Sequence, residues 1–171
     1  MWQDAHVGKK PWTAERRWES LVKKGIVDPD TQPGDLDALA GKVSAALSPT
    51  IYDDSVRSAD TRTLFEAFVD ELHAQVERKV NLSALAWRLE AIASALEGMV
   101  EIKDPLRFLE TAVLAAPTSV ALQVRLANSL LGERRYVDAE ETLARALALD
   151  PTNQDALSLL DICKRDPQRP R

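Results

Sequence analysis

The chain has 171 residues, 45% of them hydrophobic, and a formal net charge of −5. The hydrophobic share is enough for a packed core, while the acidic balance argues against nucleic-acid binding, because phosphate contacts need a basic surface. No stretch approaches the roughly 20 apolar residues of a membrane span, and the first residues hold no apolar signal-peptide core, so we expect a cytoplasmic protein without a membrane span.

The first half of the chain predicts helices and no strands. Residues 1–11 are predicted to be a flexible leader. Thr13 is placed to cap a helix that runs to Lys24, and Gly25 would end it. The apolar face of this helix consists of Trp18, Leu21 and Val22.

Two further helices follow a loop rich in helix breakers, Asp28–Asp35. The first is predicted over 35–47, and the second over 60–79. Residues 50–59 are polar and are predicted to form a loop. Each helix has one apolar stripe: Leu36, Leu39, Val43 and Leu47 on the first, and Leu64, Phe65, Phe68, Leu72 and Val76 on the second.

The second half predicts helix pairs. One pair covers Ser83–Met99 and Pro105–Ala116, with a turn over 100–104 and Asp104 as the N-cap of the second helix. The next pair begins after Thr118, its expected N-cap, turns at Gly132–Arg135 and ends at Pro151. The apolar positions of this pair are Leu122, Leu126, Leu130, Leu131, Ala139, Leu143, Ala146, Leu147 and Leu149.

The chain repeats itself at an offset of 34 residues, the length of a known helix–turn–helix repeat. At this offset Pro117 falls on Pro151 and Ala112 falls on Ala146; Leu109 with Leu143 and Ala93 with Ala127 also match. The small residues Ala127, Ala139 and Ala146 are expected where two helices approach closely.

These residues resemble the tetratricopeptide repeat family. With Val120 as the first position, the unit matches at Leu126, Ala127, Leu130, Tyr136, Ala139, Leu143, Ala146 and Pro151. Gln123 stands where the family often has Trp, and Arg134 replaces the usual turn Gly. The preceding unit, 86–119, is looser, and a third, partial unit from Gln154 has Asp161 and Lys164 on its outer face, as suits a capping helix.

The resemblance implies an all-α fold in which antiparallel helix pairs form a short right-handed solenoid. We expect four parts: the leader 1–11, a helical region 12–82 that caps the open end of the array, the repeats 83–165 with their capping helix, and a disordered tail 166–171. The resemblance covers about the second half of the chain only.

Motifs for catalysis, metal or cofactor binding are absent from the sequence. His6 and His73 lie far apart, no Gly-rich phosphate loop occurs, and no GxSxG occurs. Cys163 is the only cysteine, which rules out an internal disulfide; we expect it to be a small core residue. We therefore expect neither an enzyme nor a bound cofactor or metal.

The resemblance implies a concave groove lined by the first helix of each unit. Its predicted lining is Trp87, Glu90, Ser94, Ala121, Val124, Asn128, Leu131 and Ser158, with Ile162 beyond them. Some members clamp an acidic peptide terminus with Lys and Asn, but only Asn128 fits that pattern here. An apolar or helical segment of a partner protein is therefore the expected ligand.

Several alternatives remain open at the level of sequence. The chain could be an adaptor, scaffold or assembly factor, or a dedicated chaperone for a subunit of a secreted or membrane complex. It could also self-associate as a homodimer through Phe65, Phe68 and Leu72. Trp87 could instead plug the junction with the N-terminal helices, and Val124 and Leu131 could pack against the helix 60–79, which would fill the groove from within.

Overall fold

The computed structural model describes residues 13–47, 54–97 and 105–165, and this part of the chain is helical without any strand, as predicted. The predicted leader 1–11, the turn 100–104 with Asp104, and the tail 166–171 lie outside the described residues. The helices are α1 (Ala14–Lys23), α2 (Leu36–Leu47), α3 (Asp54–Glu77), a 3₁₀ turn η1 (Ser83–Leu85), α4 (Ala86–Ala95), α5 (Pro105–Ala115), α6 (Val120–Gly132), α7 (Tyr136–Leu149) and α8 (Gln154–Arg165).

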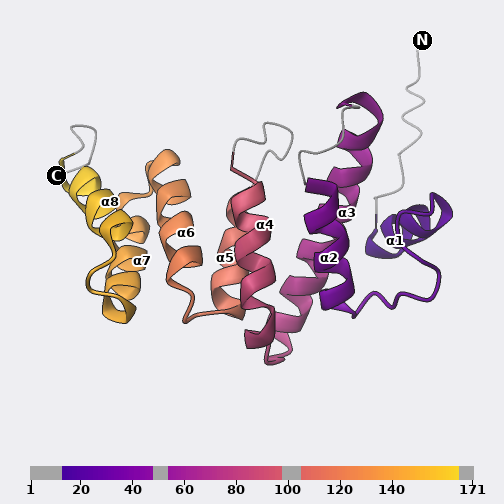
Figure 1. Cartoon of the computed structure of the whole chain (residues 1–171), viewed down its shortest axis with the longest axis horizontal. Helices are drawn as coiled ribbons and strands as arrows, with labels where there is room; N and C mark the ends of the chain where they lie inside the picture. The colour runs from indigo at the N-terminus through magenta and orange to yellow at the C-terminus, as the bar shows by residue number, and fades with distance from the viewer. Residues whose placement is uncertain (1–12, 48–53, 98–104, 166–171) are drawn as a thin grey trace, which may run out of the picture.

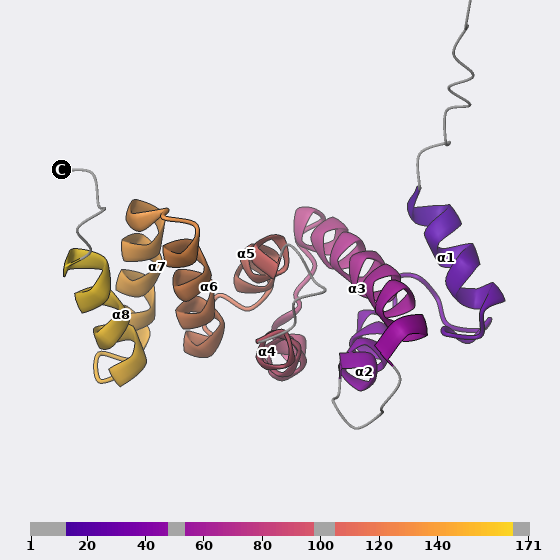
Figure 2. The ribbon, with the colours of Figure 1, turned by 90° about the horizontal axis from the view of Figure 1, so that it is seen from above.

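The helices stack in a row as a helical repeat solenoid, with α1 at one end and α8 at the other (Figure 1). Helices α2, α4, α6 and α8 follow one another along one layer, and each contacts the next. Helices α3 and α5 lie behind them and contact each other, as the view from above shows (Figure 2). Thus α2 and α3 continue the row of helix pairs that α4 to α7 form.

The boundaries of the N-terminal helices follow local signals. Thr13 caps α1 through its Oγ1, which accepts a hydrogen bond from the Arg16 N–H, and Gly25 has φ +68° after the helix. The Asp35 carboxylate accepts a hydrogen bond from the Ala38 N–H at 3.0 Å and caps α2 in the same way. The predicted stripe of α2 is buried at all of its positions.

Helix α3 is longer at its start than the sequence indicated. The predicted loop 50–59 is wrong for residues 54–59, because α3 already begins at Asp54. The segment 54–59 has no Gly or Pro to break a helix, and its polar character alone misled the prediction. The helix ends at Glu77, and Lys79, two residues later, has φ 58° in the left-handed region.

Three other local predictions need correction. The N-cap of α6 is Ser119 and not Thr118: the Ser119 Oγ accepts a hydrogen bond from the Leu122 N–H at 3.2 Å. The segment from Ser83 begins with the 3₁₀ turn before α4, and α4 ends at Ala95; the predicted end at Met99 lies outside the described residues. Gly132 still belongs to α6, and Arg134 takes the left-handed turn conformation, with φ 60°.

One large core cluster runs from α1 through α6 and also includes Ala139 of α7. At the join between α3 and α5, the ring of Phe108 lies 5.5 Å from that of Phe65 and 6.3 Å from that of Phe68, measured between centroids. Because Phe65, Phe68 and Leu72 are buried in this core, they cannot form the dimer surface that the sequence allowed.

The C-terminal pair packs through small residues. Ala127, Ala139 and Ala146 are fully buried where α6 and α7 meet, as the sequence predicted. A small second cluster joins Ala127, Leu143 and Ala146 to Ala156 of α8. Cys163 of α8 is also fully buried, and its Sγ lies 3.5 Å from the Tyr136 carbonyl oxygen, so the expected core role of the cysteine is confirmed.

Within the described segments, no helix combines the length and the apolar character that crossing a bilayer requires.

Candidate functional site

A hollow among the described residues lies between the end of α4, the first half of α6 and α8. It encloses about 670 Å³. Three elements of the same layer supply its walls, so the hollow is a groove across consecutive helix pairs. Its lining consists of Glu97, Val120, Ala121, Val124, Arg125, Asn128, Asn153, Asp155, Ser158 and Leu159.

Helix α6 supplies the central wall through one face. Ala121, Val124 and Asn128 are spaced by three and four residues, which places them along one side of the helix. Ala121 and Asn128 are exposed, whereas Val124 is partly buried against the small C-terminal core cluster. The face therefore offers an apolar stretch followed by one amide that can both donate and accept hydrogen bonds.

Helix α8 supplies the opposite wall, and its start is fixed by the turn after α7. The Asn153 Oδ1 accepts a hydrogen bond from the Ala156 N–H at 3.0 Å, which caps the helix. In the same turn, hydrogen bonds from the Thr152 hydroxyl and then the Thr152 N–H lower the pKa of Asp150, with a smaller contribution from Asn153. This turn positions Ser158 and Leu159 on the groove.

The charges of the groove are partly paired. Arg125 of α6 forms an ion pair with Glu97, at the end of α4. Asp155 lies in the first turn of α8, where a carboxylate is favoured by the helix dipole. Because Glu97 and Arg125 offset each other, Asp155 gives the groove its excess negative charge.

The structure brings together four of the eight residues predicted for the groove: Ala121, Val124, Asn128 and Ser158 line this hollow. Glu90 is used elsewhere, because its Oε1 accepts a hydrogen bond from the Ser119 hydroxyl at 2.5 Å and so ties α4 to the start of α6. Leu131 is partly buried against the large core, Ser94 is exposed away from the lining, and Ile162 is exposed on α8.

Trp87 does not line the groove, and it does not plug the junction with the N-terminal helices either. Its side chain is 60% exposed, and the Arg88 guanidinium carbon lies 4.4 Å from its ring centroid. Arg88 itself donates to both oxygens of Asp37, at 2.5 and 3.0 Å, and so joins α4 to α2. The Arg88–Asp37 ion pair therefore spans this junction, whereas the indole stays exposed.

Sequence reasoning missed six residues of the lining: Glu97, Val120, Arg125, Asn153, Asp155 and Leu159. A strict carry-over of repeat positions omits them, and the end of α4 and the turn before α8 approach α6 only after the helices stack. The one available signal was Asn153, which stands where an N-cap is expected after Pro151.

A second, more apolar pocket lies at the other end of the row, between α1 and α3. It encloses about 470 Å³, and Trp18, Pro33, Leu39, Ala67 and Ala74 contribute apolar surface to it. Glu15, Glu19, Asp70, Glu71 and Arg78 carry its charges. No motif in the sequence pointed to this pocket, because it depends on the way α1 crosses α3.

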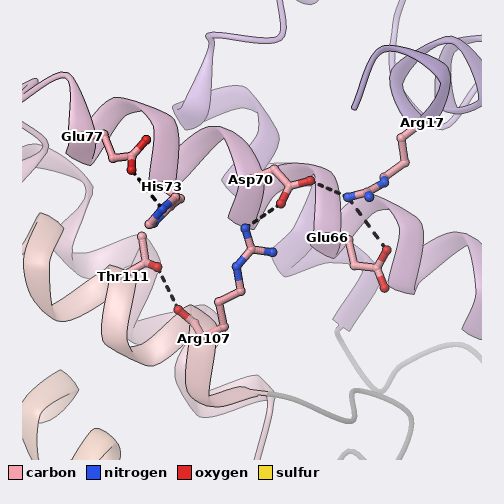
Figure 3. A network of polar contacts seen from close by, with 7 residues as sticks. All are labelled: Arg17, Glu66, Asp70, His73, Glu77, Arg107 and Thr111. Carbon is pink, nitrogen blue, oxygen red and sulfur yellow. Dashed lines mark hydrogen bonds and ion pairs between the residues drawn. The ribbon is translucent and has the colours of Figure 1, made fainter. Parts of the chain in front are cut away.

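An ion-pair network borders this second pocket (Figure 3). The Asp70 carboxylate of α3 accepts hydrogen bonds from Arg17 of α1 at 2.5 Å and from Arg107 of α5 at 2.8 Å. Glu66 lies 3.9 Å from the same Arg17 nitrogen. One carboxylate thus connects three helices that are distant in sequence.

Across the described ranges, no group of three or more His, Cys, Asp and Glu side chains is placed to hold a metal ion. His73 lies on α3 with its Nε2 3.5 Å from the Glu77 carboxylate, one turn further along the helix (Figure 3).

Comparison with known protein families identifies residues 103–162 as matching the tetratricopeptide repeat. These residues lie in the C-terminal half of the chain and cover α5, α6, α7 and most of α8. Neither the curated proteins nor the solved structures contain a match to the chain. Tetratricopeptide repeats suggest a role in protein–protein interaction, and they are generally non-catalytic.

Proposed function

We propose, from the tetratricopeptide repeats at residues 103–162, that the chain is a non-enzymatic binding module that holds a segment of a partner protein in the groove between α4, α6 and α8. The observation that carries the proposal is the groove itself. It lies on the layer that stacked helix pairs use for binding, and the chain's own N-terminal helices do not fill it.

The lining indicates the chemistry of the ligand. Val120, Val124 and Leu159 favour one or two apolar side chains, and the exposed Ala121 leaves room for them. Asn128 can pair with a backbone amide of the ligand, since its side chain has both a donor and an acceptor. Asp155 favours a basic residue near the start of α8.

A ligand of this kind is an apolar peptide segment that carries a nearby Lys or Arg. It fits the groove better than an acidic chain terminus, because α6 presents Val124 rather than a cation at the position that would hold a carboxylate. The identity of the captured segment separates an adaptor from a dedicated chaperone. A chaperone would hold a stretch that its subunit buries after assembly.

The experiment begins with a photocrosslinking amino acid at the exposed Ala121 of the full chain, incubated with extract of the producing organism. The same amino acid at Ala144, which is exposed on α7 and outside the groove lining, is the matched control. We expect a discrete crosslinked protein from position 121 only. Mass spectrometry then identifies the crosslinked segment.

A synthetic peptide with that sequence is then titrated into the full chain by calorimetry. Asn128→Ala removes one hydrogen-bonded amide and is expected to raise Kd about fivefold to tenfold. Val124→Glu places a charge on the apolar wall and is expected to raise Kd more than about tenfold. Trp87→Ala should leave Kd unchanged, and equal binding by all variants would refute the groove assignment.

A further inference from the structure

The pocket between α1 and α3 is a second surface that the groove does not explain. Ala14 and Trp18 of α1 face Ala67 and Ala74 of α3 across it. Trp18 is only partly buried, although it packs against the large core cluster. An apolar hollow of about 470 Å³ beside a half-covered indole is suited to an apolar side chain.

The rim of this pocket is acidic. Glu15 and Glu19 stand on α1, one turn apart, and Glu71 stands on α3. Asp70 is already engaged by Arg17 and Arg107, and Arg78 is the one cation among the described lining residues. The pocket therefore favours a segment that combines an aromatic or apolar side chain with positive charge.

The chain contains a segment of this chemistry directly before the pocket. Residues 1–12 read MWQDAHVGKKPW, with Lys9 and Lys10 against the single Asp4, and with Trp2 and Trp12. This segment joins α1 at Thr13, next to Ala14 of the pocket lining. Its point of attachment thus holds it at high effective concentration beside the acidic rim.

The lengths also agree. Five residues separate Lys9 from Ala14, which spans up to about 17 Å in an extended chain. The stretch of α3 from Ala67 to Arg78 rises about 16 Å at 1.5 Å per residue. The extended segment before Ala14 is therefore about as long as the stretch of α3 that lines the pocket.

We infer that the N-terminal segment 1–12 of this chain docks into the pocket between α1 and α3, with a tryptophan on the apolar floor and Lys9 and Lys10 against Glu15, Glu19 and Glu71. The occupied pocket would cover the apolar end of the helix row. The same contact would hold the basic segment away from the groove, which lies at the opposite end of the row.

Paramagnetic broadening tests this inference in the full chain. A nitroxide is attached to Ala5→Cys in a Cys163→Ala background, and amide signals are compared with the label oxidised and reduced. We expect Ala67, Glu71 and Ala74 to lose more than half of their intensity, and Asn128 and Ser158 to keep theirs. Lys9→Glu with Lys10→Glu should restore the α3 signals.

Two controls decide the source of any broadening. Lys23→Glu with Lys164→Glu changes the net charge equally outside the segment and should leave the broadening intact. A mixture of labelled chain without ¹⁵N and ¹⁵N chain without label should show no broadening; if it does, a second copy occupies the pocket and the inference is overturned. Full intensity at Ala67 and Ala74, or broadening that survives reversal of both lysines, would also overturn it.

Discussion

The Asp70 carboxylate on α3 accepts a hydrogen bond at 2.5 Å from the Arg17 guanidinium on α1. The two residues are 53 positions apart, and the Arg17 side chain is only 15% exposed, so this contact fixes where α1 crosses α3. The same carboxylate binds Arg107 of α5, whose side chain is 52% exposed.

We predict that Asp70→Ala lowers the free energy of unfolding by about 1–2 kcal/mol, because it removes the 2.5 Å contact of the poorly exposed Arg17 with a carboxylate. Arg107→Ala should cost about 0.5 kcal/mol or less, since exposed ion pairs contribute little. Urea unfolding measures both values. Hydrogen exchange should show that α1 amides lose protection in Asp70→Ala alone, and equal losses in the two variants would contradict the role of Arg17.

The turn between α6 and α7 holds Arg134 at φ 60°, where a residue with a Cβ is strained. Arg134→Gly should raise the free energy of unfolding by about 0.5–1 kcal/mol, because Gly adopts this conformation without that strain. Glu133→Gly, one residue earlier at φ −83°, is the control and should be destabilising. Thermal unfolding at fixed pH checks both variants. A loss of stability in Arg134→Gly would show that contacts of the arginine side chain stabilise the turn by more than the backbone strain costs.

Close approach of α6 and α7 depends on fully buried alanines. Ala139→Leu should destabilise the chain by about 1–3 kcal/mol, because the added methylenes have no space at this contact. Ala144→Leu on the exposed side of the same helix is the control and should change stability by less than about 0.5 kcal/mol. Denaturant unfolding followed by circular dichroism compares the two, and similar values would mean that α7 shifts to accommodate the leucine.

The periodic features of the fold could be predicted from the sequence, whereas some helix starts could not. The 34-residue offset predicted the helix pairs, and the stripes of α2 and α3 predicted the buried faces, because a periodic pattern reports directly on a helix face. The start of α3 could not be placed, because residues 54–59 carry neither a breaker nor an apolar period. Ser119 and Thr118 are both good capping residues, and only the observed hydrogen bond to the Leu122 N–H decides between them.

The candidate site was harder to predict for a different reason. Ala121, Val124 and Asn128 share one helix face, so spacing alone grouped them. Trp87 was grouped with them by its position in the repeat, but it lies outside the groove lining of the folded chain. Glu97, at the end of α4, lines the groove instead. The pocket at Trp18 arises where α1 packs against α3, and the Asp70 carboxylate binds arginines 53 and 37 positions away in the sequence. One sequence holds no local signal for such distant contacts.

Gln123 of α6 occupies a core position with its side chain 2% exposed. Its Nε2 donates to the Pro117 carbonyl oxygen at 2.6 Å, but its Oε1 has no hydrogen-bond partner among the described residues. Gln123→Met should change the free energy of unfolding by less than about 1 kcal/mol, because it loses one hydrogen bond and also removes an unsatisfied oxygen.

Gln123→Glu provides the contrasting variant, since it has nearly the same shape but carries a charge. We expect it to lose more than about 2 kcal/mol at pH 7, because burial of an unpaired carboxylate is costly. Urea titrations of the two variants give the comparison. Equal stability of Met and Glu at this position would show that water reaches the side chain.

The turn before α8 should respond to acid. Hydrogen bonds from Thr152 lower the pKa of Asp150 in the folded chain, so the stabilising contribution of its carboxylate is present above the unfolded value of about 3.9. This contribution is lost as the pH falls through the lower folded value. Asp150→Ala should therefore melt below the unmodified chain at pH 7, and the gap should narrow below about pH 4.

Asp150→Asn serves as the control for that measurement, because it keeps an oxygen that can accept the Thr152 hydrogen bonds but does not titrate. Its melting temperature should lie between the other two at pH 7, and its difference from Asp150→Ala should depend little on pH. A gap between the unmodified chain and Asp150→Ala that stays constant from pH 7 to pH 3 would contradict the assigned pKa direction.

Helix α8 buries only two side chains fully, those of Ala156 and Cys163, and yet it forms a whole wall of the groove. A terminal helix held in this way frays more easily than the interior of the row. Any ligand that contacts both α6 and α8 must then hold α8 in its folded position. Ligand binding in the groove and ordering of α8 are therefore thermodynamically linked, and the binding free energy includes the cost of ordering α8.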